Sequence, residues 1–356
     1  MIATRPGTDR DRPEIDDGQP SVVPDHGPTQ PVGPVVDEAP SPGRVAQIAA
    51  LWSGVVLVVL ALVVYGLGPS FQAREQRRLL SEHRTEIEQK ANEATGLAGI
   101  EVPTKAPAAG APVGILEIGG IALQQVAVQG AQPAQTALGP GHVPGTAGLG
   151  QPGNSVVVGR NKALGGPFGD LGALHRGDAV LVTTTQGQSI YRVDWVGDKE
   201  IRTIDPVEVD QANSDTALSA IPEETGAVDP AAANVLTADA LYGKTSDNRL
   251  TLVTSANAVP WNGSKATVVV AKLEGKPFTP TPQGSRTDAE TGLNGSSSAL
   301  APLFLALIAF GVAAAAGVFL YRRTSARSAY LVVAPPMIAF TVLAAESAIL
   351  LLPSWT

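Results

Sequence analysis

The segment LGPGHVPGTAGLGQPGNSVVVGR, residues 138–160, is the part of the sequence that decides the fold class. Glycine and proline recur along its first half, as they do in tight turns, and the β-branched run that follows has the length of a strand. Short runs of this β-type, separated by turn residues, continue on both sides of the segment. They are Ile115–Ile118, Val126–Gln129, Ser155–Gly159, Ala179–Thr184, Ser189–Val196, Leu250–Thr254 and Thr267–Leu273.

The spacing of these runs predicts a barrel. Only short helical patches such as Pro167–Leu174 fit between them, which disfavours a sheet that alternates with helices. A Pro/Ala linker precedes the runs at residues 103–112, and a Gly/Ser/Thr/Pro linker follows them at residues 275–298. We therefore expect a mainly β protein, with a closed β-barrel and short helices over residues 113–274.

Composition limits the chemistry that the chain can support. The 356 residues carry a formal net charge of −8 and a pI near 5.1, which leaves no broad basic surface for nucleic acid. The sequence contains no cysteine, so disulfides, thiolate metal sites and thiol nucleophiles are excluded. The four histidines are scattered along the chain without metal-ligand spacing. We expect no metal site, no cofactor and no nucleic-acid partner.

Three apolar stretches are long enough to cross a bilayer. They cover residues 46–68, 299–321 and 330–353, and at about 1.5 Å per residue each spans a hydrocarbon core of roughly 30 Å. The last stretch contains the ionisable Glu346, which either reaches toward the interface or packs against another span. The sequence therefore predicts a protein with three transmembrane helices that is bound to the cell membrane.

Arginines between the last two spans predict the orientation. Arg322, Arg323 and Arg327 lie in a short loop, and short loops rich in Lys and Arg stay in the cytoplasm. Residues 1–45 then form a cytoplasmic tail, rich in proline and aspartate, that we expect to be disordered. Residues 69–112 are expected outside the cytoplasm as a solvated helical stalk and the Pro/Ala linker, followed there by the barrel.

Several strings in the predicted barrel occur in the order and at the spacing of a known family. They are LGPGHVPGTA (138–147), PGNSVVVG (152–159), GPFGDL (166–171), YRV (191–193) and LTLVT (250–254). On these strings, nearly the whole region from Val113 to Glu274 resembles the class E type sortases of actinobacteria. Sortases are transpeptidases that join a sorting-signal peptide to cell-wall or pilin amines. The resemblance implies a sortase-like barrel displayed at the cell envelope.

The three positions that carry chemistry in sortases are changed in this sequence. The resemblance places Arg160 at the histidine position, Ser255 at the cysteine position and Ala266 at the arginine position. A sortase needs a thiolate nucleophile, a histidine that transfers protons and an arginine that holds the oxyanion. A guanidinium group has no acceptor and a pKa above about 12, so Arg160 cannot act as a general base. We therefore expect a catalytically inactive pseudosortase that serves as a binding or scaffolding module.

The alternative is a serine-dependent transpeptidase or acyltransferase. Ser255 would replace the cysteine as nucleophile, with Lys265 or Lys162 as its base, as in Ser-Lys enzymes on other folds. His142 is a further basic side chain, but its place in the GPGHVPGT string fits a loop-bracing role better. A substitute base must lie within reach of the Ser255 hydroxyl for this alternative to hold.

The resemblance also implies a groove in which sortases bind an extended peptide. Loss of the chemistry need not remove this groove, so an extended peptide or an envelope protein is the expected partner. The acidic segment 204–246 lies before the strand that ends at Ser255, where sortases line the groove. It could set a new partner preference, cover the groove or be a passive insertion.

Overall fold

The computed structural model describes residues 68–94, 103–202, 235–257, 264–287, 290–292, 295–323 and 326–355, with isolated positions before residue 68. The predicted cytoplasmic tail and most of the first predicted span lie outside these residues. Most of the acidic segment 204–246 also lies outside them, up to the start of β7.

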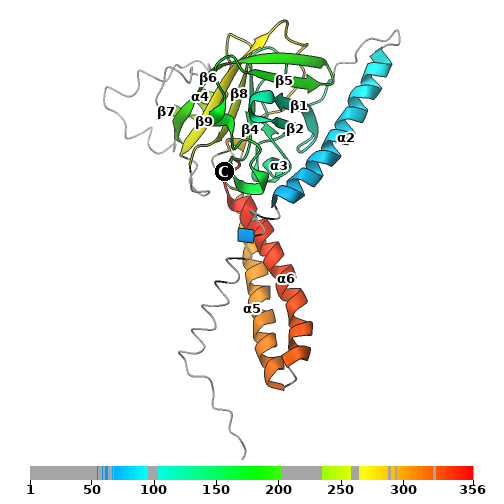
Figure 1. The fold of residues 1–356 in the computed structure, drawn as a ribbon, viewed down its shortest axis with the longest axis vertical. Helices are drawn as coiled ribbons and strands as arrows, with labels where there is room; N and C mark the ends of the chain where they lie inside the picture. Colours follow the sequence, from blue (N-terminus) through cyan, green and yellow to red (C-terminus); the bar gives the residue numbers. More distant parts are fainter. Residues whose placement is uncertain are drawn as a thin grey trace, which may run out of the picture. The chain divides into compact units, whose positions relative to one another are not determined.

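Nine strands form one sheet that closes on itself (Figure 1). Their order is β5-β1-β2-β3-β4-β8-β9-β6-β7, and the additional pairing of β5 with β6 closes eight of them into a barrel, outside which β7 extends β6. The strands are β1 Pro112–Ile118, β2 Leu123–Gln129, β3 Gly141–His142, β4 Asn154–Val158, β5 Ala179–Thr184, β6 Gly187–Arg202, β7 Val235–Thr237, β8 Arg249–Ser255 and β9 Lys265–Glu274. The closed β-barrel expected from the sequence is confirmed.

Strand details differ from the prediction in two ways. β3 and β7 were not predicted, because two or three residues carry no alternating pattern that could reveal a strand. The expected helical patch Pro167–Leu174 contains only one short 3₁₀ turn, Leu171–Ala173. The other short helices are 3₁₀ turns at Gly119–Ile121, Ala163–Gly165 and Ser297–Ala299, and α-helices α3 Pro133–Thr136 and α4 Ala238–Tyr242.

The barrel wall has apolar side chains on both of its faces. Interior side chains come from strands around the ring and include Leu116, Val157, Leu252 and Val269. Their immediate neighbours on β4, β8 and β9 point the opposite way, because successive strand residues alternate between faces. These neighbours form a second buried cluster on the outside of the wall, the outer-face cluster, which consists of Ala131, Val143, Val156, Val158, Ile201, Leu236, Ala238, Leu241, Tyr242, Val253, Ala266, Val268, Val270 and Trp355.

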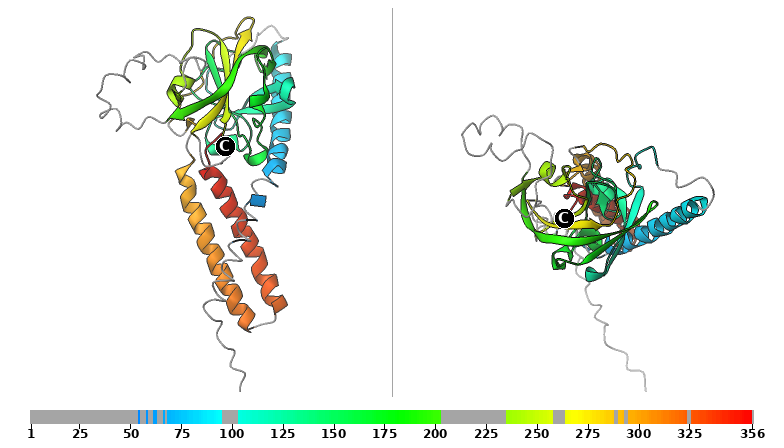
Figure 2. Two further views of the ribbon diagram at one scale, coloured as in Figure 1. Left: turned by 60° about the vertical axis from the view of Figure 1, so that its left-hand side comes forward. Right: turned by 90° about the horizontal axis from the view of Figure 1, so that it is seen from above.

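Helix α2, Gly68–Ala94, covers another part of the barrel (Figures 1 and 2). Its Gln76 side chain donates to the carbonyl oxygens of Val126 (3.1 Å) and Leu138 (2.8 Å) and accepts from the Val126 N–H (2.7 Å). Leu79 packs with residues of β1 and β2. The expected helix is therefore present, but the expectation of a stalk solvated all round is corrected, because one face of α2 packs on the barrel wall.

Residues 276–287, inside the predicted linker 275–298, form no helix or strand but lie against the barrel. The Phe278 N–H donates to the Gly150 carbonyl (2.8 Å), and Gln151 bonds the Thr281 hydroxyl (2.8 Å). The Gln129 side chain donates to the Gln283 carbonyl (2.8 Å). These contacts tie the segment after β9 to the barrel surface.

Two long apolar helices follow: α5, Leu300–Arg323, and α6, Ala326–Leu351. Within the described residues, only Ser297–Leu320 and Leu331–Leu351 have the length and composition of a membrane span. The prediction of three spans is thus supported for two, since most of the stretch 46–68 is not described. The two helices contact closely at Gly317, where a Cβ atom would lie 3.0 Å from the Val333 side chain.

Candidate functional site

Three neighbouring strands bring the sequence-predicted positions together. β4 and β8 run parallel with Val158 opposite Val253, and β8 and β9 run antiparallel with Ser255 opposite Ala266. Arg160 follows the end of β4 by two residues. Arg160, Ser255 and Ala266 therefore lie at one end of the same three strands, and all three are buried.

Among the described residues, the Ser255 hydroxyl makes one hydrogen bond, and that bond does not activate it. Its Oγ accepts the N–H of Asn257 at 3.2 Å, while the Ser255 carbonyl accepts the side-chain amide of Asn161. A hydroxyl becomes a nucleophile only when a base within hydrogen-bond reach removes its proton. No lysine or histidine among the described residues makes a hydrogen bond to Ser255 Oγ.

Neither lysine of the alternative mechanism makes a hydrogen bond to the Ser255 hydroxyl. Lys265 is exposed next to buried Ala266, and adjacent residues of a strand point to opposite faces. Because Ala266 is the residue opposite Ser255, Lys265 lies on the other face of the wall. Lys162 is exposed as well.

Arg160 is a fully buried cation with few partners. One guanidinium nitrogen donates to the Pro133 carbonyl at 3.1 Å, and Nε and Nη1 have no hydrogen-bond partner among the described residues. Burial lowers the pKa of Arg160 to about 10, so the side chain stays charged at neutral pH. A buried charge without a counter-ion destabilises the folded state, so this arrangement needs an explanation.

His142 also lies in the barrel wall, and its side-chain contacts are with Gln129 on the neighbouring strand β2 and with the loop that follows β3. Its Nε2 lies 2.8 Å from the Ala147 carbonyl and its Nδ1 lies 2.9 Å from Oε1 of Gln129. The Thr146 hydroxyl is 3.3 Å from Nε2. Burial lowers the pKa of His142 to about 4. These bonds fit the loop-bracing role and give His142 no contact with Ser255.

Trp355 is the site residue that sequence reasoning missed. It follows α6 by a few residues and is fully buried in the outer-face cluster. Its main-chain carbonyl accepts the N–H of Ser255 (3.0 Å) and the N–H of Asn161 (3.2 Å), and the Thr254 hydroxyl lies 3.4 Å away. The chain's own residues thus occupy the end of β4 and β8 at which the three sequence-predicted positions lie.

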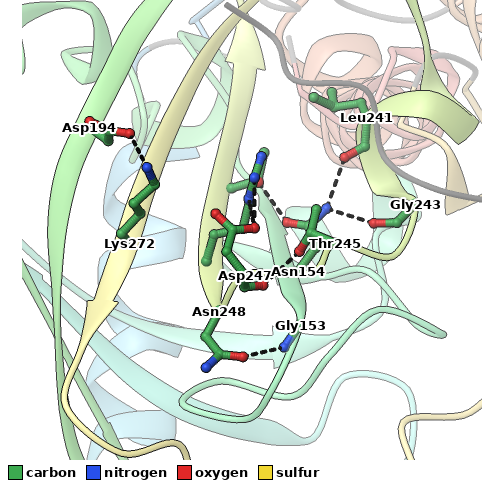
Figure 3. A network of polar contacts seen from close by, with 11 residues as sticks. Gly153, Asn154, Asp194, Leu241, Gly243, Thr245, Asp247, Asn248 and Lys272 are labelled. Carbon is green, nitrogen blue, oxygen red and sulfur yellow. Dashed lines mark hydrogen bonds and ion pairs between the residues drawn. The ribbon is translucent and has the colours of Figure 1, made fainter.

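The opposite end of the same strands is fixed by a polar network (Figure 3). The Asn154 side-chain amide donates to the carbonyls of Leu241 (3.0 Å) and Gly243 (3.1 Å), while its oxygen accepts the Thr251 hydroxyl (2.7 Å). The Asn248 side chain accepts the Gly153 N–H at 3.0 Å. These bonds anchor α4 and the following loop to β4, so that the outer face is covered at both ends.

Comparison with known proteins identifies the barrel. Residues 116–274 match the family model described as the sortase domain. No curated protein matches the chain. The barrel is therefore a sortase-fold domain, in agreement with the resemblance that the sequence strings carry, and the match covers less than half of the chain.

Solved structures of sortases are similar to about half of the chain. A sortase D5 transpeptidase from Clostridium perfringens is 18% identical over 57% of this chain and 99% of its own, with a TM-score of 0.38. Sortase E from Streptomyces avermitilis is 23% identical over 51% of this chain and 98% of its own, with a TM-score of 0.31. Sortase A from Listeria monocytogenes is 18% identical over 47% of this chain and 91% of its own, with a TM-score of 0.29.

Proposed function

We propose that this chain is a membrane-anchored, catalytically inactive sortase-like protein whose barrel is a binding or scaffolding module at the cell envelope. The observation that carries the proposal is the chemistry at the ends of β4, β8 and β9. There Arg160 offers no acceptor for a proton, Ser255 has no base hydrogen-bonded to its hydroxyl among the described residues, and Ala266 supplies no cation at the position that the resemblance assigns to the arginine. A transpeptidase of the sortase type requires a base, an activated nucleophile and an oxyanion-binding cation.

The membrane anchor of the proposal rests on α5 and α6. Both have the length and composition of a span. The contact between Trp355 and the barrel supports an arrangement in which the end of α6 and the barrel lie on the same side of the membrane. The arginines between the two helices favour the cytoplasm for the turn and the extracytoplasmic side for the barrel, with the N-terminal tail in the cytoplasm.

The expected partner class is an extended peptide or an envelope protein, bound on the outer face of β4, β8 and β9. That face is covered by α4, β7 and Trp355 within the described residues. An external peptide could reach Ser255 and Ala266 only after Trp355 leaves. The proposal therefore concerns a partner that displaces residues of the chain itself.

An assay with the full chain in nanodiscs tests the loss of catalysis. The chain is incubated with sorting-signal peptides and an amine acceptor, and cleavage and transfer are followed by mass spectrometry. A parallel Trp355→Ala variant removes the blocking side chain, so that a missing reaction is not due to blocked access. We expect no turnover from either protein. Turnover that disappears in Ser255→Ala would contradict the proposal and establish a serine acyltransferase.

A second variant asks whether the site is otherwise that of a sortase. Arg160→His, Ser255→Cys and Ala266→Arg are combined in the Trp355→Ala background, which restores the three groups of the family's chemistry. We expect measurable cleavage of a sorting-signal peptide from this variant and none from its parent. The matched control keeps Ser255 and carries the other three changes, and it should be inactive.

A further inference from the structure

The carbonyl of Trp355 is held as a bound peptide would be held. Two main-chain N–H groups, those of Asn161 and Ser255, donate to it at 3.2 and 3.0 Å. The two donors come from the ends of neighbouring strands, and the β8–β9 ladder does not use the Ser255 N–H. Main-chain donors recognise a peptide carbonyl without regard to its side chain, so this pair of donors is a general peptide-binding feature.

The indole of Trp355 supplies the specific part of the contact. It is fully buried in the outer-face cluster with Val158, Val253 and Ala266. Gly292 also lies against the indole, where a Cβ atom would be 3.3 Å from the ring, and the Gly292 carbonyl accepts the Ser354 N–H at 3.0 Å. A large aromatic ring buried at a strand end is the usual anchor of a peptide in a groove.

The small residue at position 266 fits this occupant. Ala266 is fully buried and belongs to the same cluster as Trp355. An arginine there would place a long charged side chain in the apolar space that the indole fills. Alanine at position 266, where sortases have the oxyanion-binding arginine, therefore also leaves room for the indole of Trp355.

The closed arrangement leaves several polar groups without partners. Nε and Nη1 of Arg160, Oγ of Ser354 and Nε1 of Trp355 are buried and have no hydrogen bond among the described residues. Oγ of Ser354 and Nε1 of Trp355 belong to the segment that packs on the barrel, and each loses its water when the segment packs there. Release of the segment would return these two groups to water, which favours a contact that can be released.

We propose that residues 353–355 are a built-in peptide ligand of the barrel, which seals the site around Ser255 reversibly through the indole and main-chain carbonyl of Trp355. The ligand class is an extended peptide with an aromatic anchor, presented directly after a membrane-spanning helix, and its occupant is the chain itself. The proposal goes beyond the proposed function, because this occupancy holds whether or not the barrel does chemistry.

Thiol labelling of the full chain in nanodiscs tests it. The sequence contains no cysteine, so Ser255→Cys introduces a single thiol at a buried position. We expect slow reaction with a maleimide, and at least a tenfold faster reaction when Trp355→Ala is added. Trp355→Phe, which keeps an aromatic anchor, should retain most of the protection. Equal rates with and without Trp355→Ala would overturn the proposal.

Two controls separate a tethered ligand from other causes. Ser189→Cys places the thiol at a buried site on β6, outside the outer-face cluster, and its labelling should not respond to Trp355→Ala. Acceleration at both sites would mean that Trp355 holds the whole fold together, and the proposal would fail. Protection of Ser255→Cys that disappears on dilution would assign the occupant to a second copy and would also overturn it.

Discussion

Two buried basic side chains in the barrel wall differ in how well they are bonded. His142 has a partner at each ring nitrogen, from Gln129 and Ala147. Arg160 makes one hydrogen bond, to Pro133, and has two unpaired donor nitrogens among the described residues. Both side chains are buried to a similar degree. Burial alone therefore does not define a structural role. Of these two side chains, only His142 has a contact at each polar nitrogen, and one of these contacts holds the loop at Ala147.

Replacing His142 should change the free energy of unfolding more than any other substitution considered below. His142→Ala removes the hydrogen bond that the neutral imidazole can donate from Nε2 to the Ala147 carbonyl and the 2.9 Å contact of Nδ1 with Oε1 of Gln129, and it creates a cavity. We expect the free energy of unfolding to fall by about 3 kcal/mol. Urea unfolding of the full chain in detergent micelles, followed by tryptophan fluorescence, measures it. The control is His175→Ala, at an exposed position, which should change stability little.

The free energy of unfolding should also depend on pH through His142. In the folded barrel the pKa of His142 is about 4, below its ordinary value of 6.5, so the unfolded chain binds more protons between these values. The contribution of the neutral His142 side chain to the free energy of unfolding is fully present above pH 6.5 and is lost as the pH decreases toward 4. The loss should reach about 2 kcal/mol at pH 4.5.

The variant His142→Gln separates the pH dependence due to His142 from that due to other groups. Glutamine cannot take up a proton in this range, so the variant should lose that part of the pH dependence and keep the part due to carboxylates. The same urea titrations, repeated at several pH values, provide the comparison. Parallel pH profiles for the native chain and the variant would exclude His142 as the source.

Replacing the poorly bonded side chain should have a smaller effect, of opposite sign. Arg160→Met removes a buried charge and keeps an apolar chain of similar length, at the loss of one bond to Pro133. Replacement of a buried, poorly paired charge is neutral or stabilising, and we expect a gain of about 1 kcal/mol. A loss of 3 kcal/mol or more, as expected on breaking a well-formed buried pair, would show that Arg160 has a partner.

The smallest effect is expected at Ser255. Ser255→Ala removes one hydroxyl that accepts a long hydrogen bond from Asn257. We expect a change of less than about 1 kcal/mol in the free energy of unfolding and no change in the products of the peptide assay. A chain in which Ser255 acted as a nucleophile would lose its activity with this substitution.

Much of the barrel could be predicted because its main strands are long enough to carry a pattern. All seven runs of β-type residues correspond to strands, and alternation along β4, β8 and β9 explains why each is buried on both faces. β3 and β7 are too short for any such pattern. The packing of α2 on the barrel was not predicted, because its buried face includes the polar residues Gln72 and Gln76, which indicate a solvated helix in the sequence.

The positions around the site could be predicted, but what fills it could not. Motif spacing selected Arg160, Ser255 and Ala266 as the positions matching the sortase chemistry, and strand pairing brings these three positions together. Trp355 lies 101 residues from Thr254, and no local pattern indicates a contact over that separation. A tryptophan after an apolar span ordinarily marks the membrane interface, so its burial in the barrel required the structure.

Hydrogen exchange at two backbone amides measures directly whether residues 353–355 occupy the site around Ser255. The N–H groups of Asn161 and Ser255 donate to the Trp355 carbonyl. In the full chain in nanodiscs we predict that both are protected, and that deletion of residues 353–356 removes this protection while the amides of Val157 and Leu252 stay protected. Fast exchange of the Ser255 amide in the native chain, or protection that survives the deletion, would contradict the account.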